Sequence, residues 1–262
     1  MIPLENINSI EQLKEDYGDK LPIHLGVILD GNRRWIKRKG IKDTFKGHLV
    51  GYNTLKKMIY SSYDCGIKYL SIYALSTDNV AKRSKKEINY LFELLLKGIE
   101  EVFEEPLTFE KEVKIQVSGH VEDLPKAFQE KIKNIQESTK KHNKYFLNMC
   151  IVYDGQEEIV DAVKKIINKG IHPNKISKEI IKQNLYTPEI PEVDYIIRTG
   201  MEDGARISGF LLWDASYAEF RFRDELWPDY NEEMLLEDLK EYVRRNRRMG
   251  ARSISSLNRE IC

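Results

Sequence analysis

Apolar and polar residues follow one another along the chain in a pattern that predicts alternating strands and helices. Short apolar runs, each as long as a buried strand, occupy residues 23–29, 69–75, 113–117, 145–152, 193–197 and 219–222. Apolar residues at helical spacing occupy 45–65, 85–103, 125–142, 157–168 and 231–249. This alternation predicts a single-domain α/β fold in which helices flank a mainly parallel central sheet.

The remaining segments complete the predicted organisation. Residues 1–20 predict a polar helical appendage, 21–250 the main domain and 251–262 a C-terminal tail. Ser177 is expected to cap a short helix, and residues 210–213 are expected to begin another. Because no Pro-, Gly- or Ser-rich linker and no internal repeat interrupts the 262 residues, one core is the simpler expectation.

Cysteine usage and the apolar runs predict where the protein works. Cys65, Cys150 and Cys262 are an odd set without metal-ligand spacing, which favours structural thiols in a reducing compartment. No apolar run approaches bilayer length, and the N-terminus lacks a basic region followed by an apolar one. We therefore expect a cytoplasmic protein that can still touch a membrane surface.

Polar side chains stand where the predicted strands end. They follow the first strand as Asp30-Gly31-Asn32-Arg33-Arg34-Trp35, the second as Ser76 and Asn79, the fourth as Asp154, and the fifth as Arg198. Parallel strands bring these groups to one sheet edge, where open α/β sheets bind ligands. Arginines and helix N-terminal amides favour a phosphate there, and a carboxylate inside a phosphate site suits a divalent metal.

Taken singly, these residues have structural explanations. Asp-Gly with solvated arginines is common in surface turns, Ser76 and Asn79 can cap the next helix, and His48 can be a packed histidine. Several basic groups and two carboxylates on one edge favour instead a site for two diphosphates and Mg²⁺. The helix at 85–103 is explained equally well by core packing and by a wall for an apolar substrate.

Charge changes this picture only locally. The 42 Lys and Arg residues balance the 42 Asp and Glu residues, so overall charge gives no argument for binding nucleic acid or an anionic membrane. Residues 32–48 and 244–252 are strongly basic, whereas residues 100–112 are acidic. Nucleic-acid binding is disfavoured because aromatic residues do not interleave with these arginines.

Five stretches occur in order over roughly residues 21–250. They are DGNRRW after the first apolar strand, KGHLVGYNTL, LSIYALSTDNVAKRSKKEINYLFELL, VDYIIRTG and ISGFLLWDASYAEFRFRDELWPDY. In this order they resemble the signatures of the cis-prenyltransferases, the undecaprenyl diphosphate synthase family. The trans-prenyltransferases catalyse the same condensation with aspartate-rich DDxxD motifs on an all-helical fold, whereas this chain has no adjacent Asp-Asp pair.

The resemblance implies a reaction and a set of partners. The family condenses isopentenyl diphosphate with an allylic diphosphate primer, forms cis double bonds, uses Mg²⁺ and is usually a homodimer with an elongated apolar tunnel. Peripheral membrane contact through the lipid product is implied as well. Preorganised arginines, amides and Mg²⁺ stabilise the leaving diphosphate, and a dry apolar surrounding protects the allylic cation.

The resemblance also implies roles for single residues. Asp30 is the magnesium-linked aspartate, and Glu219 is the second magnesium ligand, acting from the partner end of the site. The allylic diphosphate is held by Gly31, Asn32, Arg33 and Arg34, with Trp35 in the same motif and His48 beside it. Ser76 and Asn79 assist condensation or proton removal, together with Asp30, Asn32 and His48 as the catalytic set. Isopentenyl diphosphate is bound by Arg198, Arg206 and Ser208.

The chain departs from the family pattern in ways that leave alternatives open. RTGMEDGARISGF has about two extra residues before Arg206 and has Gly209 in place of Asn, while 152–156 reads VYDGQ where the family has N-Y-G-G-R. An arginine before G-H is lacking, with Lys42 or Lys46 as substitutes. An irregular enzyme making branched or cyclised lavandulyl-type diphosphates therefore remains an alternative. A non-catalytic subunit is disfavoured because Asp30 and Glu219 are both present.

Product length is predicted from one small side chain. Ala74 lies just before Ser76, and in the family a small residue near this place leaves the tunnel open. We therefore expect a medium to long Z-polyprenyl diphosphate. The DGNRRW form also resembles short-chain members, and Leu75, Leu91, Phe92 and Leu95 are bulky enough to block the tunnel, so a short-chain synthase remains the alternative.

Overall fold

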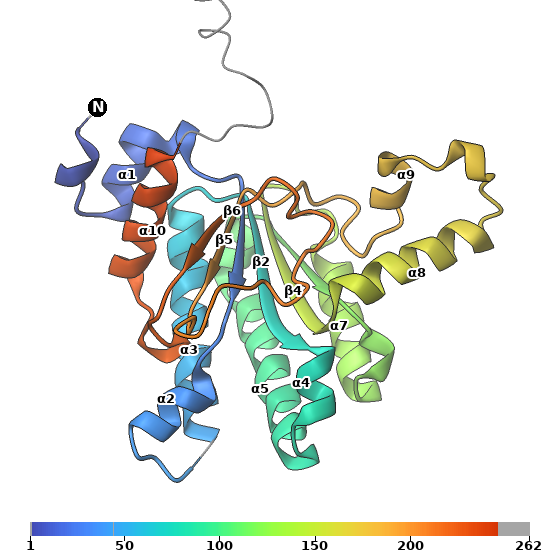
Figure 1. Cartoon of the computed structure of the whole chain (residues 1–262), viewed down its shortest axis with the longest axis horizontal. Coiled ribbons are helices and arrows are strands. Elements are labelled where there is room, and N and C mark those ends of the chain that lie inside the picture. Colours follow the sequence, from blue (N-terminus) through green and yellow to red (C-terminus); the bar gives the residue numbers. More distant parts are fainter. Residues whose placement is uncertain (1, 44, 246–262) are drawn as a thin grey trace, which may run out of the picture.

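A six-stranded sheet organises the chain, and every pairing within it is parallel. The computed structural model describes residues 2–43 and 45–245. The strands are β1 His24–Ile28, β2 Tyr69–Ser76, β3 Val113–Ser118, β4 Tyr145–Tyr153, β5 Tyr195–Arg198 and β6 Glu219–Phe222, in the spatial order β3-β4-β2-β1-β5-β6. Helices pack around the sheet (Figure 1), so the α/β prediction is confirmed.

The helices are α1 Ile10–Tyr17, α2 Asn32–Arg38, α3 Phe45–Asp64, α4 Thr77–Lys82, α5 Lys85–Glu104, α6 Pro106–Glu110, α7 Lys126–Thr139, α8 Gly155–Asn168, α9 Lys178–Lys182 and α10 Glu232–Arg244. Helices connect the successive strands from β1 to β5, whereas a helix-free segment of turns connects β5 to β6; α1 precedes the sheet in the sequence and α10 follows it. Short 3₁₀ turns lie at Leu4–Asn6, Gly18–Lys20, Val121–Asp123, Pro173–Lys175 and Trp227–Asp229. Among the described residues, no helix is long and apolar enough to cross a membrane.

Two sequence expectations differ from the structure, and a third falls largely outside the described residues. Residues 210–213 form turns rather than the start of a helix, because Ser208, Gly209 and Leu211 adopt positive φ angles that a right-handed helix excludes. The N-terminal segment is not a separate appendage, since Ile10 and Leu13 of α1 are buried in the main core. Helix α10 ends at Arg244; residues 246–249 of the predicted helix and the tail at 251–262 lie outside the described residues.

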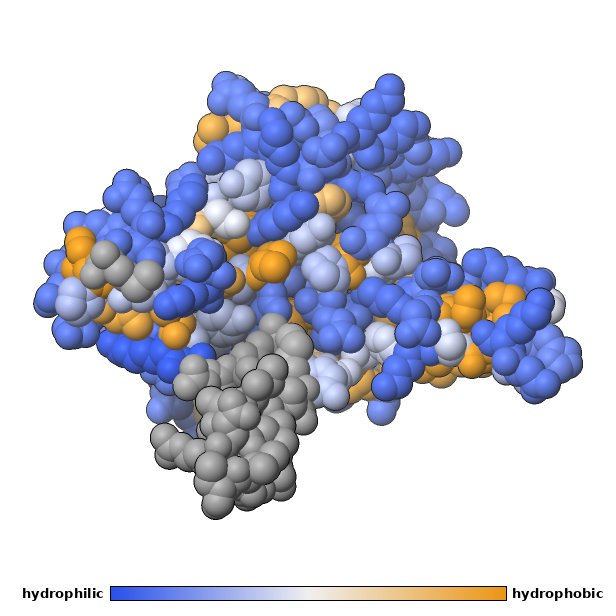
Figure 2. All heavy atoms as spheres, turned by 90° about the horizontal axis from the view of Figure 1, so that it is seen from above, coloured by the Kyte–Doolittle hydropathy of each residue, from blue (hydrophilic) through white to orange (hydrophobic). Residues whose placement is uncertain are grey.

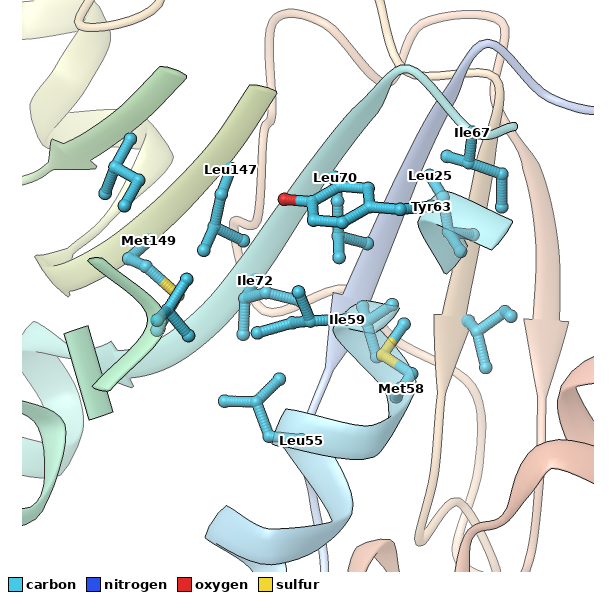
Figure 3. Packing of buried hydrophobic residues seen from close by; sticks show 14 of the residues in the cluster. Leu25, Leu55, Met58, Ile59, Tyr63, Ile67, Leu70, Ile72, Leu147 and Met149 are labelled. Atoms are coloured by element: carbon cyan, nitrogen blue, oxygen red, sulfur yellow. The ribbon is translucent and has the colours of Figure 1, made fainter. Parts of the chain in front are cut away.

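The larger core lies between the sheet and the helices on one of its faces. Leu55 and Ile59 of α3 point toward Ile72 of β2 and toward Leu147 and Met149 of β4 (Figure 3). Helices α5 and α7 add further apolar side chains to this cluster. A smaller cluster on the opposite face is built on Phe210, which stacks on Tyr73 at 5.0 Å between ring centroids. The sheet is therefore buried on both faces, as parallel sheets are.

Strand β2 carries an irregularity where it approaches the end of the sheet. Tyr73 pairs with Cys150 and Leu75 pairs with Ile151, so that Ala74 has no partner across the β2–β4 ladder. Such a bulge turns the following side chain toward a different face. Ala74 and Leu75 consequently both pack on the α3–α5 side of the sheet.

Candidate active site

A cavity of about 670 Å³ opens at the carboxyl ends of β1, β2, β4 and β5. The sequence-predicted residues that line it are Asp30, Gly31, Asn32, Arg33, Arg34, His48, Ser76, Asn79, Arg198 and Ser208. Its volume falls within the range of small-molecule sites. The parallel sheet thus brings together groups that are far apart in the sequence, as the positions of the strand ends predict.

Asp30 lies between two arginines at this edge. Its Oδ2 is 2.9 Å from Nη2 of Arg198, and its Oδ1 is 3.1 Å from Nη2 of Arg34. Its backbone carbonyl accepts hydrogen bonds from the Thr199 hydroxyl and the Trp227 amide, which fix the segment after β1. The carboxylate side chain is nevertheless 31% exposed, so it faces the cavity and can exchange its partners for a ligand.

Arg198 is the most constrained cation of the site. Its Nη1 donates to the Arg206 carbonyl and to Oγ of Ser208, both at 2.8 Å. Its Nε is buried and has no hydrogen-bond partner within the described part of the chain. A buried donor without a partner is costly, so a bound anion that accepts from Nε would be stabilised.

Close approach of α2 and α3 explains the two glycines of KGHLVG. A Cβ on Gly47 would lie 2.3 Å from Ile36, and one on Gly51 would lie 2.1 Å from Oδ1 of Asn32. Gly31, which precedes α2, has φ +116°, a conformation that glycine alone adopts readily. Oδ1 of Asn32 is itself buried without a partner, while its Nδ2 donates to the Leu29 carbonyl at 3.4 Å.

His48 belongs to a charged cluster centred on Glu87 at the start of α5. Nε2 of His48 lies 3.3 Å from Oε1 of Glu87, which is also 3.6 Å from Nη1 of Arg83 and 3.9 Å from Nε of Arg33. Burial and the nearby Arg83 lower the pKa of His48. The ring is therefore neutral near pH 7 and can accept or donate a hydrogen bond.

Ser76 and Asn79 form the helix cap that their spacing in the sequence allows. The Ser76 hydroxyl caps α4 by accepting from the Asn79 amide at 3.1 Å, and Oδ1 of Asn79 accepts from Nη2 of Arg83 at 3.0 Å. Both side chains also line the cavity. Capping does not exclude a role toward a ligand, because each oxygen retains a free lone pair.

Three predicted site residues lie outside the cavity lining. Nε1 of Trp35 donates to Oδ1 of Asp229 at 2.7 Å, and the exposed side chain of Arg206 contacts the Gly204 carbonyl at 3.5 Å. Glu219 opens β6 and is level with Tyr195 and Leu25, so it lies at the opposite end of the strands from Asp30. About five residues of strand, roughly 16 Å, separate those two levels. Glu219 pairs instead with Arg245 at 3.0 Å.

Five further polar residues of the lining were not among the predicted catalytic and binding residues, although Asp154 was expected at this sheet edge. They are Tyr73, Asp78, Arg83, Asp154 and Gln156. Arg83 ends α4 in an extended conformation just before Ser84 caps α5, so its approach to Asn79 and Glu87 depends on the break between two helices and gave no sequence signal. Asp154 caps α8, and its Oδ1 accepts from the amides of Gln156 and Glu157.

The carboxylates of this site could hold a magnesium ion only together with a substrate. Within the described ranges, no group of three His, Cys, Asp or Glu side chains is placed to hold a metal. Mg²⁺ is commonly bound through one or two carboxylates together with substrate phosphates and water. Asp30 therefore fits an ion that arrives with a diphosphate rather than one held in an all-protein cage, and a single chain does not bring Glu219 to the same ion.

The arrangement combines a cationic mouth with an apolar interior. Arg33, Arg34, Arg83 and Arg198 line one end, while Ala74, Leu75 and Leu91 line the part that faces the α3–α5 side of the sheet. One guanidinium group can donate two parallel hydrogen bonds to diphosphate oxygens, and the apolar wall suits a hydrocarbon tail. An amphiphilic diphosphate is thus the ligand that this geometry favours.

Comparison with known proteins agrees with this chemistry. Residues 28–250 match the family described as "Putative undecaprenyl diphosphate synthase". A Methanocaldococcus jannaschii protein named tritrans,polycis-undecaprenyl-diphosphate synthase (geranylgeranyl-diphosphate specific) is 41% identical over 88% of this chain and 84% of its own length. A Micrococcus luteus ditrans,polycis-undecaprenyl-diphosphate synthase ((2E,6E)-farnesyl-diphosphate specific) is 37% identical over 88% of this chain and 92% of its own.

Two solved structures share the fold over nearly the whole domain. Lavandulyl diphosphate synthase from Lavandula x intermedia, in complex with dimethylallyl diphosphate, has a TM-score of 0.83 and 30% identity, covering 89% of this chain and 100% of its own. An undecaprenyl diphosphate synthase from Campylobacter jejuni, described as probable, has a TM-score of 0.71 and 31% identity, with coverages of 88% and 99%. The family match, these relatives and the fold together show that the chain belongs to the cis-prenyltransferase (undecaprenyl diphosphate synthase) family of prenyl-transferring enzymes.

Proposed function

We propose that the protein elongates an allylic diphosphate primer with isopentenyl diphosphate and releases a Z-polyprenyl diphosphate. The observation that carries the proposal is Arg198, whose buried Nε lacks a partner beside Asp30 and Ser208. In each cycle the allylic carbon–oxygen bond breaks, a new carbon–carbon bond forms and a proton is lost. The site must therefore hold two diphosphates and keep water from the allylic cation.

The two diphosphates are assigned to two groups of residues. The allylic diphosphate is held by Gly31, Asn32, Arg33 and Arg34, with His48 and Arg83 beside it. Isopentenyl diphosphate is held by Arg198 and Ser208, with Arg206 contributing from the same loop. Ser76 and Asn79 lie between the groups and are placed to accept or relay the proton. The leaving diphosphate keeps its arginine partners as its charge develops.

Mg²⁺ is part of the proposal through Asp30. When bound, the ion would neutralise charge on the departing diphosphate. Arg34 and Arg198 now occupy both oxygens of Asp30, and a diphosphate that takes over these guanidinium groups leaves the carboxylate free for the ion. Glu219 can be the second magnesium ligand, as predicted, only if a second copy of the protein places its own Glu219 near Asp30.

A homodimer would supply such a second copy. Helix α8 projects from the sheet with α9 (Figure 1), and apolar side chains lie on this arm in Figure 2. Val160, Val163 and Ile167 of α8 are 45–68% exposed and form an apolar helix face that residues 2–43 and 45–245 leave uncovered. Peripheral contact with a membrane belongs to the same proposal, because the polyprenyl product is a lipid.

Chain elongation is favoured over irregular coupling by the apolar lining at Ala74, Leu75 and Leu91, which can receive a tail longer than the primer. The structural neighbour named lavandulyl diphosphate synthase makes irregular coupling the second candidate. The segment that carries the two extra residues, 201–205, is tied to α2 by Arg38 and Glu202 at the edge of the site.

One incubation separates the candidates. Purified protein with Mg²⁺, labelled isopentenyl diphosphate and dimethylallyl, geranyl, farnesyl or geranylgeranyl diphosphate in turn should give a ladder of linear Z-products, sized by chromatography and mass spectrometry. Dimethylallyl diphosphate alone should give no product. Branched or cyclised products from dimethylallyl diphosphate alone would replace the proposal with irregular coupling, and an absence of product with every primer would refute both.

A further inference from the structure

A second cavity continues the apolar part of the site between α3 and α5. It measures about 20 Å³, against about 670 Å³ for the first, and is lined by Leu55, Leu95, Ile99 and Met149 among others. His48 and Leu91 of the first cavity lie one helical turn before Tyr52 and Leu95 of the second. The two cavities therefore lie along one seam, here called the α3–α5 seam.

The partly buried ring of Tyr52 lies in the seam and contacts α5. A Cβ on Gly98 of α5 would lie 2.8 Å from Cε2 of Tyr52, so the ring of α3 rests directly on the glycine. The Tyr52 hydroxyl donates to Oε2 of Glu101, which also accepts from Nζ of Lys56 at 3.1 Å. The ring is thus held at its face by Gly98 and at its tip by a charged acceptor.

The seam remains apolar beyond this point. Ile59 of α3 and Val102 of α5 line the second cavity past Tyr52, and both are buried. A hydrocarbon tail would find a compatible surface there if the ring were removed. With the ring in place, a tail that passes must displace it from Gly98 and break its hydrogen bond to Glu101.

We propose that Tyr52, seated on Gly98, closes the α3–α5 seam and sets the upper limit of product length. The inference rests on the proposed elongation and adds to it the residue that ends it. A growing chain advances from the diphosphate site past Leu91 and Leu95, and addition stops when its end meets the ring. Tyr52 is a specificity-determining residue in this account and makes no contact with the reacting atoms.

Product sizing on single variants tests the inference. Tyr52→Ala should shift the longest main product upward by one or more isoprene units, and Tyr52→Leu should shift it by less. Tyr52→Phe keeps the ring and should keep the wild-type length. Tyr60→Ala is the matched control, because Tyr60 is another tyrosine of α3 that lines neither cavity, and it should leave the product distribution unchanged.

A double variant that fills the space left by the Tyr52 ring tests the inference in the opposite direction. Tyr52→Ala combined with Gly98→Leu places a side chain back into the same space and should return the product toward the wild-type length. If Tyr52→Ala and Tyr52→Leu fold by thermal melting, turn over and give the wild-type distribution, the inference is wrong while elongation stands. If Tyr52→Ala fails to fold, Tyr52→Leu decides alone. If the wild-type protein itself makes no extended chain, the proposed function has failed first.

Discussion

Two carboxylates in this chain each bind two arginines, but one lies at the edge of a cavity and the other is buried in the protein interior. Asp30 binds Arg34 and Arg198 at the cavity edge with its side chain 31% exposed. Asp238 of α10 binds Arg221 and Arg223 at 2.8–2.9 Å, accepts from the Tyr230 hydroxyl at 3.0 Å, and is fully buried. The contacts are alike, but only the Asp30 group can exchange partners for a ligand.

The comparison shows why a count of ion pairs does not locate a site. Every polar atom of the Asp238 carboxylate has a partner within the protein, so that cluster fastens α10 to β6. The Asp30 cluster leaves the Nε of Arg198 and the Oδ1 of Asn32 without partners. A partly exposed carboxylate and an incompletely satisfied arginine on the lining of a cavity therefore indicate a candidate ligand site, whereas the fully buried and fully satisfied Asp238 group stabilises the fold.

The largest expected effect is the loss of stability on breaking the buried cluster. Asp238→Ala leaves Arg223, which is 5% exposed, without its main partner, and should lower the free energy of unfolding by about 3–5 kcal/mol. Urea denaturation of the wild type and the variant measures this difference. The kcat of the molecules that remain folded should stay near the wild-type value, and a selective loss of kcat would make Asp238 part of the active site.

Asp30→Ala should show the reverse pattern. We expect kcat to fall by roughly a hundredfold or more, as when other electrostatic groups of an active site are removed. The melting temperature should fall by less than in Asp238→Ala, because Asp30 is 31% exposed at the cavity edge, where water can take its place beside Arg198. Steady-state kinetics and a thermal melt on the same preparation check both parts. A variant that condenses at a near-normal rate would remove Asp30 from the catalytic set.

A pair of histidines extends the comparison to pH. Burial lowers the pKa of His24 from 6.5 to about 4, and its ring bonds the Pro191 carbonyl and the Ser71 hydroxyl. In the unfolded chain His24 is protonated below about pH 6.5, whereas in the folded chain it is protonated only below about pH 4. Because the unfolded state binds the additional proton between these values, acidification lowers the free energy of unfolding. Between pH 7 and pH 5 this group alone should cost about 2 kcal/mol.

The variant His24→Gln isolates that contribution. Its unfolding free energy, measured in urea at both pH values, should fall less on acidification than that of the wild type. An equal fall in the two proteins would assign the acid sensitivity to other groups. His48, whose pKa is also lowered by burial, adds to the fall with the same sign in both proteins and so cancels in the comparison.

The smallest expected effect is a change in the KM for isopentenyl diphosphate, and it differs between Arg198 and Arg206, to which the sequence assigned the same role. Arg198→Ala should raise the KM for isopentenyl diphosphate by roughly tenfold or more, as expected for hydrogen bonds to a charged group, and should change the KM for the primer little. Arg206→Ala should raise the same KM by less, because the Arg206 side chain is exposed and its carbonyl makes the recorded contact with Arg198. Initial rates with each substrate varied in turn measure both constants. Equal effects on the two substrates would contradict the division of the site.

Sequence reasoning could predict which residues share one cavity because of the sheet rather than because of single residues. Alternating elements require parallel strands, and parallel strands gather Asp30, Ser76, Asp154 and Arg198 at one edge regardless of the details of packing. The same reasoning could not place Glu219, because its position along β6 depends on strand register. It predicted a helix at 210–213, where positive φ angles at Ser208 and Leu211 shape a turn instead.

Packing between helices was the other source of error. Lys82, Arg83, Lys85 and Lys86 are consecutive basic positions around Ser84, and the sequence alone does not say which of them faces inward. The structure selects Arg83, since its guanidinium meets Asn79 and Glu87. The contact of Tyr52 with Gly98 was likewise invisible, because it depends on the distance between α3 and α5.

The unpaired position in β2 has a consequence for how such enzymes diverge. Ala74 lines the large cavity, yet the β2–β4 ladder passes over it from Tyr73 to Leu75. A larger side chain at this position has no paired residue on β4 to displace, and it changes the space that the cavity offers to the proposed product. Substitutions at this one position could therefore change the lipid product while the fold is kept. Descendants of one ancestor could then differ in the lipid they make before they differ in architecture.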